Sequence, residues 1–110
     1  MKLPPSEFTL TDWEKQPSVE VAGERGFARI CTQQWEQLRI RVVVYSPGYI
    51  ADHWCTKGHL VYIVEGEVET ELRDGRKFRL TPGMSYRVSE SLELPHRSST
   101  RTGAKLFIVD

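Results

Sequence analysis

The sequence predicts an all-β fold of antiparallel strands, arranged as a sandwich or a barrel. Several stretches alternate apolar and polar residues, which is typical of strands with one buried face. Turn residues interrupt these stretches about every eight to twelve residues, and apolar residues rarely recur at helical spacing. A chain of 110 residues has the size of one domain. We expect an N-terminal arm at residues 1–10 and one β-barrel domain at residues 11–110.

The first half of the chain contains three predicted strands. Residues 19–22 and 27–34 flank the turn-forming tract Gly-Glu-Arg-Gly and predict a β-hairpin. The next strand runs over residues 38–45, where aliphatic residues occupy every even position. We expect the even residues to face the core, namely Leu38, Ile40, Val42 and Val44. The odd residues are then expected to face outward, namely Arg39, Arg41, Val43 and Tyr45.

The second half continues the pattern. Val68, Thr70 and Leu72 alternate with outward-facing glutamates at positions 67, 69 and 71. Asp74-Gly75 follows and predicts a type I′ turn, because both central residues of that turn need positive φ. Phe78 and Leu80 then resume the apolar alternation, residues 84–88 form a strand with Tyr86 inward, and residues 105–110 form the last strand.

Charge and hydropathy exclude two classes of partner. Fifteen basic and fifteen acidic residues are mixed along the chain without a block of either sign, so we expect no nucleic-acid or anionic-membrane interface. No apolar run reaches the roughly 20 residues of a membrane span, and the N-terminus lacks the apolar core of a signal peptide. We expect a cytoplasmic protein whose two cysteines remain thiols.

Two of the three histidines fall with a cysteine in the tract His53-Trp54-Cys55-Thr56-Lys57-Gly58-His59. A strand through this tract points His53, Cys55 and His59 to one face. Imidazole and thiolate are the usual ligands of zinc and related metals, so this face is a candidate metal site. The alternative is a set of isolated polar residues at a barrel mouth, with Cys55 as a small buried hydrophobe.

These residues resemble the first motif of the cupin superfamily, in which a glycine precedes His-x-His, a glutamate and a closing glycine. Gly48 and Gly66 fall on the two glycines, and His53, Cys55 and His59 fall on the two histidines and the glutamate. A weaker second motif runs from Gly83 to Thr100, with His96 as its histidine. The resemblance covers residues 38–109 and implies an antiparallel double-sheet jelly-roll barrel that holds one metal through His53, Cys55, His59 and His96.

The departures from the cupin motifs change the implied ligand set. Cysteine replaces a histidine and histidine replaces the glutamate, so a thiolate stands where the family has imidazole and no carboxylate is present. The thiolate favours zinc, with iron as the redox-active alternative. The tract Ala51–Cys55 is similar to a group of small bacterial cupins named for Asp-His-Cys-Trp, a group without an established activity, although Trp54 and Cys55 stand here in reverse order.

Three functions fit these residues. The first is a metal-dependent enzyme acting on a small polar molecule in the barrel, of the oxygenase, isomerase or decarboxylase class, with Tyr86 as a candidate hydrogen-bond donor to the bound molecule. The second is a non-catalytic binding or sensing module with a closed structural zinc site. The third is a metal-free barrel that serves in assembly. We also expect a homodimer, in which Val43, Tyr45 and Val61 or Tyr62 are covered.

Overall fold

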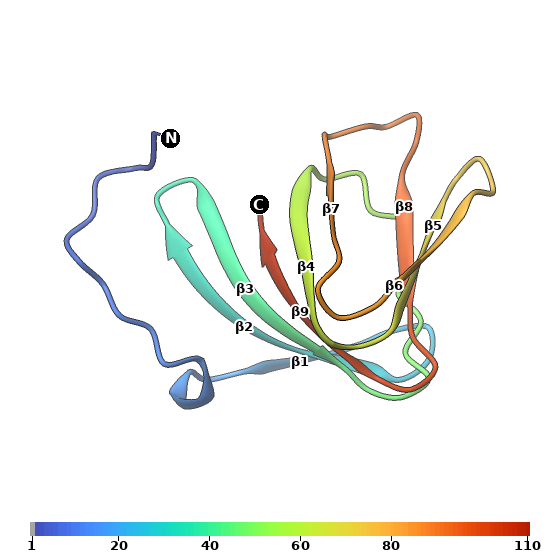
Figure 1. Ribbon diagram of the computed structural model, residues 1–110, viewed down its shortest axis with the longest axis horizontal. Coiled ribbons are helices and arrows are strands. Elements are labelled where there is room, and N and C mark those ends of the chain that lie inside the picture. Colours follow the sequence, from blue (N-terminus) through green and yellow to red (C-terminus); the bar gives the residue numbers. More distant parts are fainter. Residues whose placement is uncertain (1) are drawn as a thin grey trace.

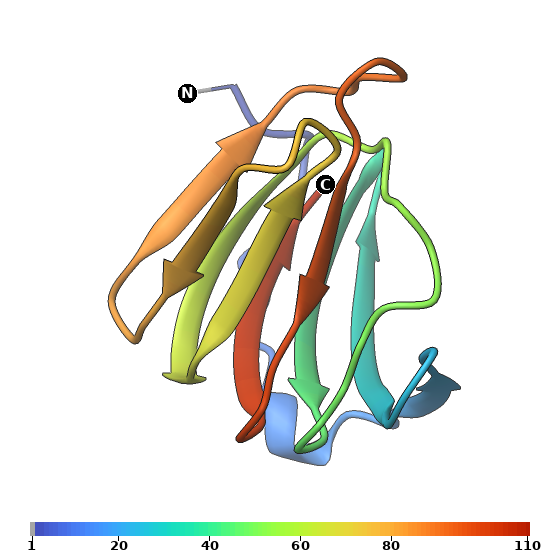
Figure 2. The same ribbon diagram turned by 90° about the vertical axis from the view of Figure 1, so that its right-hand side faces the viewer.

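The structure is a computed structural model that describes residues 2–110, and it contains two antiparallel sheets that face each other (Figures 1 and 2). The larger sheet has six strands in the order β1 (Val19–Ala22), β2 (Phe27–Trp35), β3 (Leu38–Tyr45), β9 (Ala104–Val109), β4 (His59–Gly66) and β7 (Ser85–Val88). The smaller sheet has three strands in the order β6 (Lys77–Leu80), β5 (Val68–Leu72) and β8 (His96–Ser99). The predicted all-β jelly roll is confirmed, with two sheets that remain separate rather than closing into one barrel.

Both predicted hairpins form, but the turn of the second one differs from the prediction. The β5–β6 hairpin pairs Val68 with Leu80 and Thr70 with Phe78. Within its loop only Gly75 has positive φ, at 96°, so the predicted type I′ turn is wrong. The carboxylate of Asp74 accepts a hydrogen bond from the backbone N–H of Arg76, and Asp74 has a negative φ. This local hydrogen bond favours a longer loop in which Gly75 alone is left-handed.

The chain crosses from the larger to the smaller sheet at Gly66. This residue has a φ of 77°, and a Cβ atom placed on it would lie 2.1 Å from the carbonyl oxygen of Gly103. Only glycine permits both this conformation and this close approach. The crossing positions Val68 and Thr70 of β5 opposite the larger sheet, where both are buried.

The core lies between the sheets and is aliphatic. It is formed by Ala28, Val43, Tyr49, Val61, Ile63, Val68, Leu80, Ala104, Leu106 and Ile108. Alternation along β4 and β9 places the odd residues of β4 and the even residues of β9 in this core.

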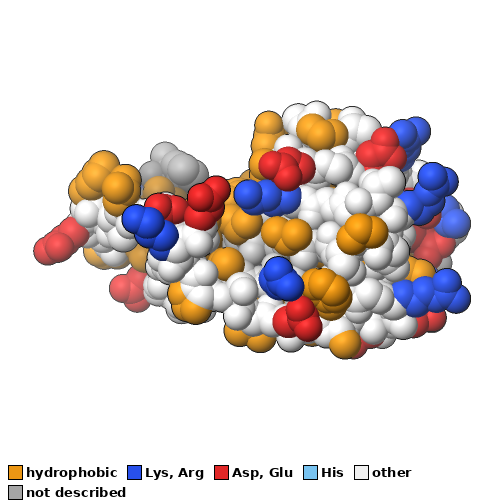
Figure 3. All heavy atoms as spheres, turned by 90° about the horizontal axis from the view of Figure 1, so that it is seen from below, with side chains coloured by type: hydrophobic (Ala, Val, Ile, Leu, Met, Phe, Trp, Pro, Cys, Tyr) orange, Lys and Arg blue, Asp and Glu red, His pale blue; other side chains and the backbone are white. Residues whose placement is uncertain are grey.

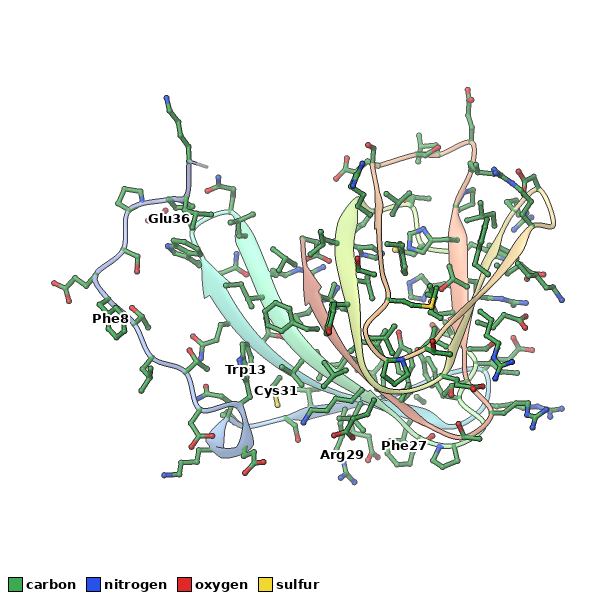
Figure 4. All side chains as sticks on the ribbon, in the orientation of Figure 1. Phe8, Trp13, Phe27, Arg29, Cys31 and Glu36 are labelled. Carbon is green, nitrogen blue, oxygen red and sulfur yellow. The ribbon has the colours of Figure 1, made fainter. Side chains whose placement is uncertain are left out.

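The predicted inward face of β3 is wrong. Val43 is 2% exposed and belongs to the core, whereas Val44 is 43% exposed on the outer face. Both faces of this strand carry apolar residues, so polarity alone did not distinguish them. The outer face is partly covered: Trp13 of the short 3₁₀ helix η1 (Trp13–Lys15) packs edge-on against Phe107, the β9 neighbour of Val42 (Figure 4).

The apolar residues that face outward therefore differ from those expected. Val43 and Val61 are core residues, and Tyr45 lines an internal cavity. The half-exposed apolar residues of β3 and β4 are instead Val44, Leu60, Tyr62 and Val64. In the view from below, apolar side chains lie dispersed among charges of both signs (Figure 3).

The N-terminal segment runs along the outside of the β2–β3 hairpin (Figure 1). Residues 2–12 form no strand, and Phe8 is 94% exposed. One hydrogen bond ties the segment to the hairpin, donated by the indole Nε1 of Trp35 to the carbonyl of Pro5. Of the arm expected at residues 1–10, Met1 lies outside the described residues. Within residues 2–110, no helix has the length and apolar character needed to cross a membrane.

Candidate metal centre

Three of the four predicted ligands come together between the two sheets. The ligand atoms of Cys55, His59 and His96 all lie within 4.8 Å of one another. The two imidazole Nε2 atoms, of His59 and His96, are 2.7 Å apart. The side chain of His59 is 8% exposed and His96 is 4% exposed, so both rings face the interior.

Each ligand comes from a different part of the fold. His59 is the first residue of β4 in the larger sheet, and His96 is the first residue of β8 in the smaller sheet. Cys55 lies in the segment before β4 and pairs with His96 through two backbone hydrogen bonds, of 2.7 and 3.0 Å. This pairing fixes Cys55 beside His96, so the group bridges the two sheets.

The structure does not bring His53 into this group. Its side chain is 70% exposed, and its Nδ1 atom lies 2.7 Å from a carboxylate oxygen of Asp52. The expectation of one shared face assumed a continuous strand through residues 53–59, whereas this segment contains only the isolated bridge at Cys55 before β4 begins. Strand parity therefore does not apply to it, and His53 lies at the wall of the adjoining cavity rather than among the three ligand atoms.

Trp54 is absent from the cavity wall. The guanidinium groups of Arg73 and Arg97 lie over its ring, 4.9 and 4.8 Å from the centroid. Cation–π contacts of this kind stabilise the indole in one orientation. They hold the segment next to Cys55 against the smaller sheet.

The carboxylate of Asp110 lies behind His59 and was not predicted from the sequence. Asp110 accepts hydrogen bonds from Arg39 and Arg41, at 2.9 and 2.6 Å, and its side chain is 5% exposed. Its Oδ2 atom lies 3.6 Å from Nδ1 of His59, which is longer than a hydrogen bond, so it acts on the ring through its charge. The signal was present in β3: if the odd residues face inward, the two arginines need a buried acid to pair with.

Burial keeps both histidines neutral. Burial and the neighbouring His59 lower the pKa of His96 to about 4. Burial also lowers the pKa of His59, with Asp110 opposing the shift. Burial alone would raise the pKa of Asp110, but the hydrogen bonds and charges of Arg39 and Arg41 hold it below its ordinary value. Neutral imidazoles and an ionised carboxylate are the forms that metal ligation requires.

The donor set fits a divalent transition metal. Two imidazoles and a thiol are ligands of zinc and iron rather than of magnesium or calcium. The 2.7 Å between the Nε2 atoms of His59 and His96 corresponds to a hydrogen bond shared by the two rings. Tetrahedral ligation at the usual zinc–nitrogen distance separates two nitrogens by about 3.3 Å, so the two Nε2 atoms need to move apart by about 0.6 Å. Cys55, His59 and His96 thus form a candidate metal site.

Comparison with known proteins agrees with this architecture at the level of fold. No protein-family model and no curated protein sequence matches the chain. Among solved structures, an RmlC-like cupin from Shewanella frigidimarina superimposes with a TM-score of 0.70 at 21% identity, over 94% of this chain and 89% of that one. The chain has the cupin fold. At 21% identity the similarity supports a shared fold and does not identify a shared function.

Two enzymes share this cupin fold. Ectoine synthase from P. lautus matches with a TM-score of 0.73 at 18% identity, over 93% of this chain and 76% of that one. Fe(II)-HppE, solved with the alternative substrate (S)-1-HPP, matches with a TM-score of 0.75 at 15% identity, over 97% of this chain. The chain spans 62% of the length of HppE.

A cavity adjoins the ligand group between the two sheets. Its volume is about 170 Å³, and its wall includes His59, His96, Tyr45 and Tyr86. Tyr86 faces inward as strand parity predicts, with its ring 6.0 Å from each of the two imidazole rings. Burial raises the pKa of Tyr86 to about 12, so its hydroxyl stays protonated and able to donate a hydrogen bond.

The other cysteine lies elsewhere. Cys31 is on β2, on the outer side of the larger sheet close to Trp13 (Figure 4). Its thiol lies 3.9 Å from the carbonyl of Gln16. The two thiols of the chain therefore occupy different environments, and Cys55 alone joins the histidines.

Proposed function

We propose that the protein binds one divalent transition metal through Cys55, His59 and His96 and acts as a metal-dependent enzyme on a small polar molecule held in the cavity. The observation that carries this proposal is the number of ligands. Three protein ligands with a cavity beside them leave room for a water or a substrate, which is the arrangement of catalytic rather than structural zinc sites. The bound metal supplies Lewis acidity or redox chemistry, and the chain supplies the ligands, the cavity and the Tyr86 hydroxyl.

A closed structural site is the second candidate, and one observation favours it. His53 lies at the wall of the same cavity and is 70% exposed. In this closed site we propose that the His53 ring turns away from Asp52 and serves as the fourth protein ligand. The two functions therefore differ in the role of His53: it is dispensable in the open site and required in the closed one.

Metal analysis of tag-free protein tests the proposal. We expect about one zinc or iron ion per chain in the wild type, an equal content in His53→Ala, and almost none in His59→Ala. The cobalt(II)-substituted protein is then titrated with azide, which changes the visible spectrum if a coordination position is open. A wild-type protein that takes up no metal after reconstitution contradicts the proposal. Loss of metal in His53→Ala together with no response to azide supports the closed site instead.

A further inference from the structure

One cationic side chain of the cavity has a hydrogen-bond donor without an acceptor. Arg41, in the middle of β3, lines the cavity together with His59 and His96. Its side chain is 16% exposed, and its Nη2 atom donates to Asp110 at 2.6 Å. Neither its Nε nor its Nη1 atom has a hydrogen-bond partner among residues 2–110, and of the two only Nε is fully buried. Because polar donors in protein interiors are almost always paired, the accessible Nη1 donors of this largely buried guanidinium call for a further acceptor.

The side-chain charges behind the cavity support the same requirement. Arg39 and Arg41 share the side-chain carboxylate of Asp110, and arginine remains protonated in proteins. The Asp110 side chain therefore balances the charge of Arg41 only in part, and the Arg41 side chain is largely buried. A low-dielectric surrounding strengthens the attraction of such a charge for an anion.

The other charged groups of the cavity wall are already paired. Arg97 lies 3.5 Å from a carboxylate oxygen of Glu24 and 3.6 Å from one of Glu71, and it stacks on Trp54. Asp52 is more than half exposed and pairs with His53. Arg41 is thus the cavity residue whose charge and donors are only partly used.

The size of the cavity limits what the anion is. A cavity of about 150 Å³ accommodates benzene, so the present volume of about 170 Å³ suits a molecule of about six to eight non-hydrogen atoms. Val43, Val61 and Leu106 contribute apolar walls. The planar donor array of a guanidinium matches a carboxylate.

We propose that Arg41 anchors the carboxylate of the small molecule that occupies the cavity, so the substrate class is a small carboxylic acid. This inference rests on the proposed function, because it places that molecule beside Cys55, His59 and His96. It adds a specificity-determining residue on β3, where the side chain is held in place by Asp110.

Lactate, with six non-hydrogen atoms, and its neutral amide lactamide are suitable probes, titrated calorimetrically into the zinc-loaded and the metal-free protein. We expect lactate to bind the wild type more tightly than lactamide, and Arg41→Gln to weaken lactate binding by about tenfold or more while leaving lactamide binding unchanged. Arg29→Gln is the matched control. Arg29 lies on the neighbouring strand β2, pairs with Glu20 at an exposed position and is absent from the cavity wall, so its replacement is expected to change lactate affinity by less than about threefold.

Arg41→Lys is the second variant, which keeps the test decisive if Arg41→Gln does not fold. Lysine retains the charge opposite Asp110 but lacks the planar donor array, so lactate affinity is expected to fall severalfold in a folded protein. Equal lactate affinity in the wild type and both Arg41 variants overturns the carboxylate site, as does the absence of lactate binding to the wild type. Failure to bind metal overturns the proposed function instead, and Arg41-dependent binding of lactate to the metal-free protein still supports the carboxylate site in that case.

Discussion

The carboxylate of Asp110 lies 3.6 Å from Nδ1 of His59, while Nε2 on the other side of the same ring faces His96. Two arginines hold this carboxylate in place, and its side chain is almost completely buried. A carboxylate behind a ligating histidine orients the ring and raises its basicity. Asp110 is therefore a positioning residue for the candidate metal centre.

Replacing this carboxylate tests its role. Asp110→Asn keeps the shape of the side chain but removes its charge, so zinc affinity is expected to fall by about tenfold to a hundredfold. Competition with a chromophoric chelator measures the affinity. Asp74→Asn, in the exposed β5–β6 loop, is the control and is expected to leave it unchanged. Equal affinities in the two variants would contradict the positioning role.

Cys55 is expected to be the ligand that selects the metal. Cys55→Ser replaces a soft thiolate by a hydroxyl that stays protonated, so zinc affinity is expected to fall by at least about tenfold. The cobalt(II) form of the wild type is expected to show a thiolate charge-transfer band that Cys55→Ser lacks. Cys31→Ser, which alters the thiol on the outer side of β2, is expected to keep the band. A wild-type spectrum without this band would remove Cys55 from the ligand set.

The low pKa of His96 predicts that the metal-free protein loses stability in mild acid. The folded-state pKa is about 4 and the unfolded value is about 6.5, so the unfolded chain takes up a proton that the folded protein does not. The contribution is present above pH 6.5 and is lost as the pH falls toward 4, by up to about 3 kcal/mol. Urea unfolding between pH 7 and pH 4 measures this loss.

The same experiment has a matched pair of variants. His96→Gln is expected to reduce the pH dependence, because one of the two buried histidines with a lowered pKa is gone. His53→Gln changes an exposed imidazole and is expected to leave the slope as in the wild type. A slope that depends on His53 and not on His96 would contradict the assignment.

Adjacent residues of β3 test which face is buried. Val43→Ala removes two methyl groups from the core and is expected to lower the free energy of unfolding by about 2 kcal/mol. Val44→Ala makes the same chemical change on the half-exposed face and is expected to cost less than about 1 kcal/mol. Chemical denaturation measures both values, and the reverse order would mean that the even residues face the core.

The exposed face of the larger sheet predicts a homodimer. Val44, Leu60, Tyr62 and Val64 are all at least 40% exposed, and a symmetric contact between two copies covers such a face. Light scattering at micromolar concentration is expected to give about twice the mass of one chain. Tyr62→Lys is expected to shift the protein to the monomer, whereas Phe78→Lys on β6 is the control on another sheet. A monomeric wild type would refute the prediction.

The sequence by itself determined most of the strands and their boundaries, but it did not predict β4 or β8. Alternation over 38–45 and over 67–72, with glycines at the turns, is a local property, because neighbouring residues and their φ preferences create it. Histidine and cysteine in one short tract named Cys55 and His59 together with His53, and the resemblance to the cupin motifs added His96.

Only the tertiary structure decided which face of β3 is buried and which residues share a site. Both faces of β3 carry apolar side chains, so the choice depended on the sheet packed against it and on Asp110, which is 69 residues away from the Arg41 it pairs with. His59 and His96 are 37 residues apart and meet because their strands belong to opposing sheets. His53 lies outside the ligand group because, within residues 53–58, the backbone pairs with β8 only at Cys55. Contacts of this kind arise from packing between distant segments, which local residue patterns do not encode.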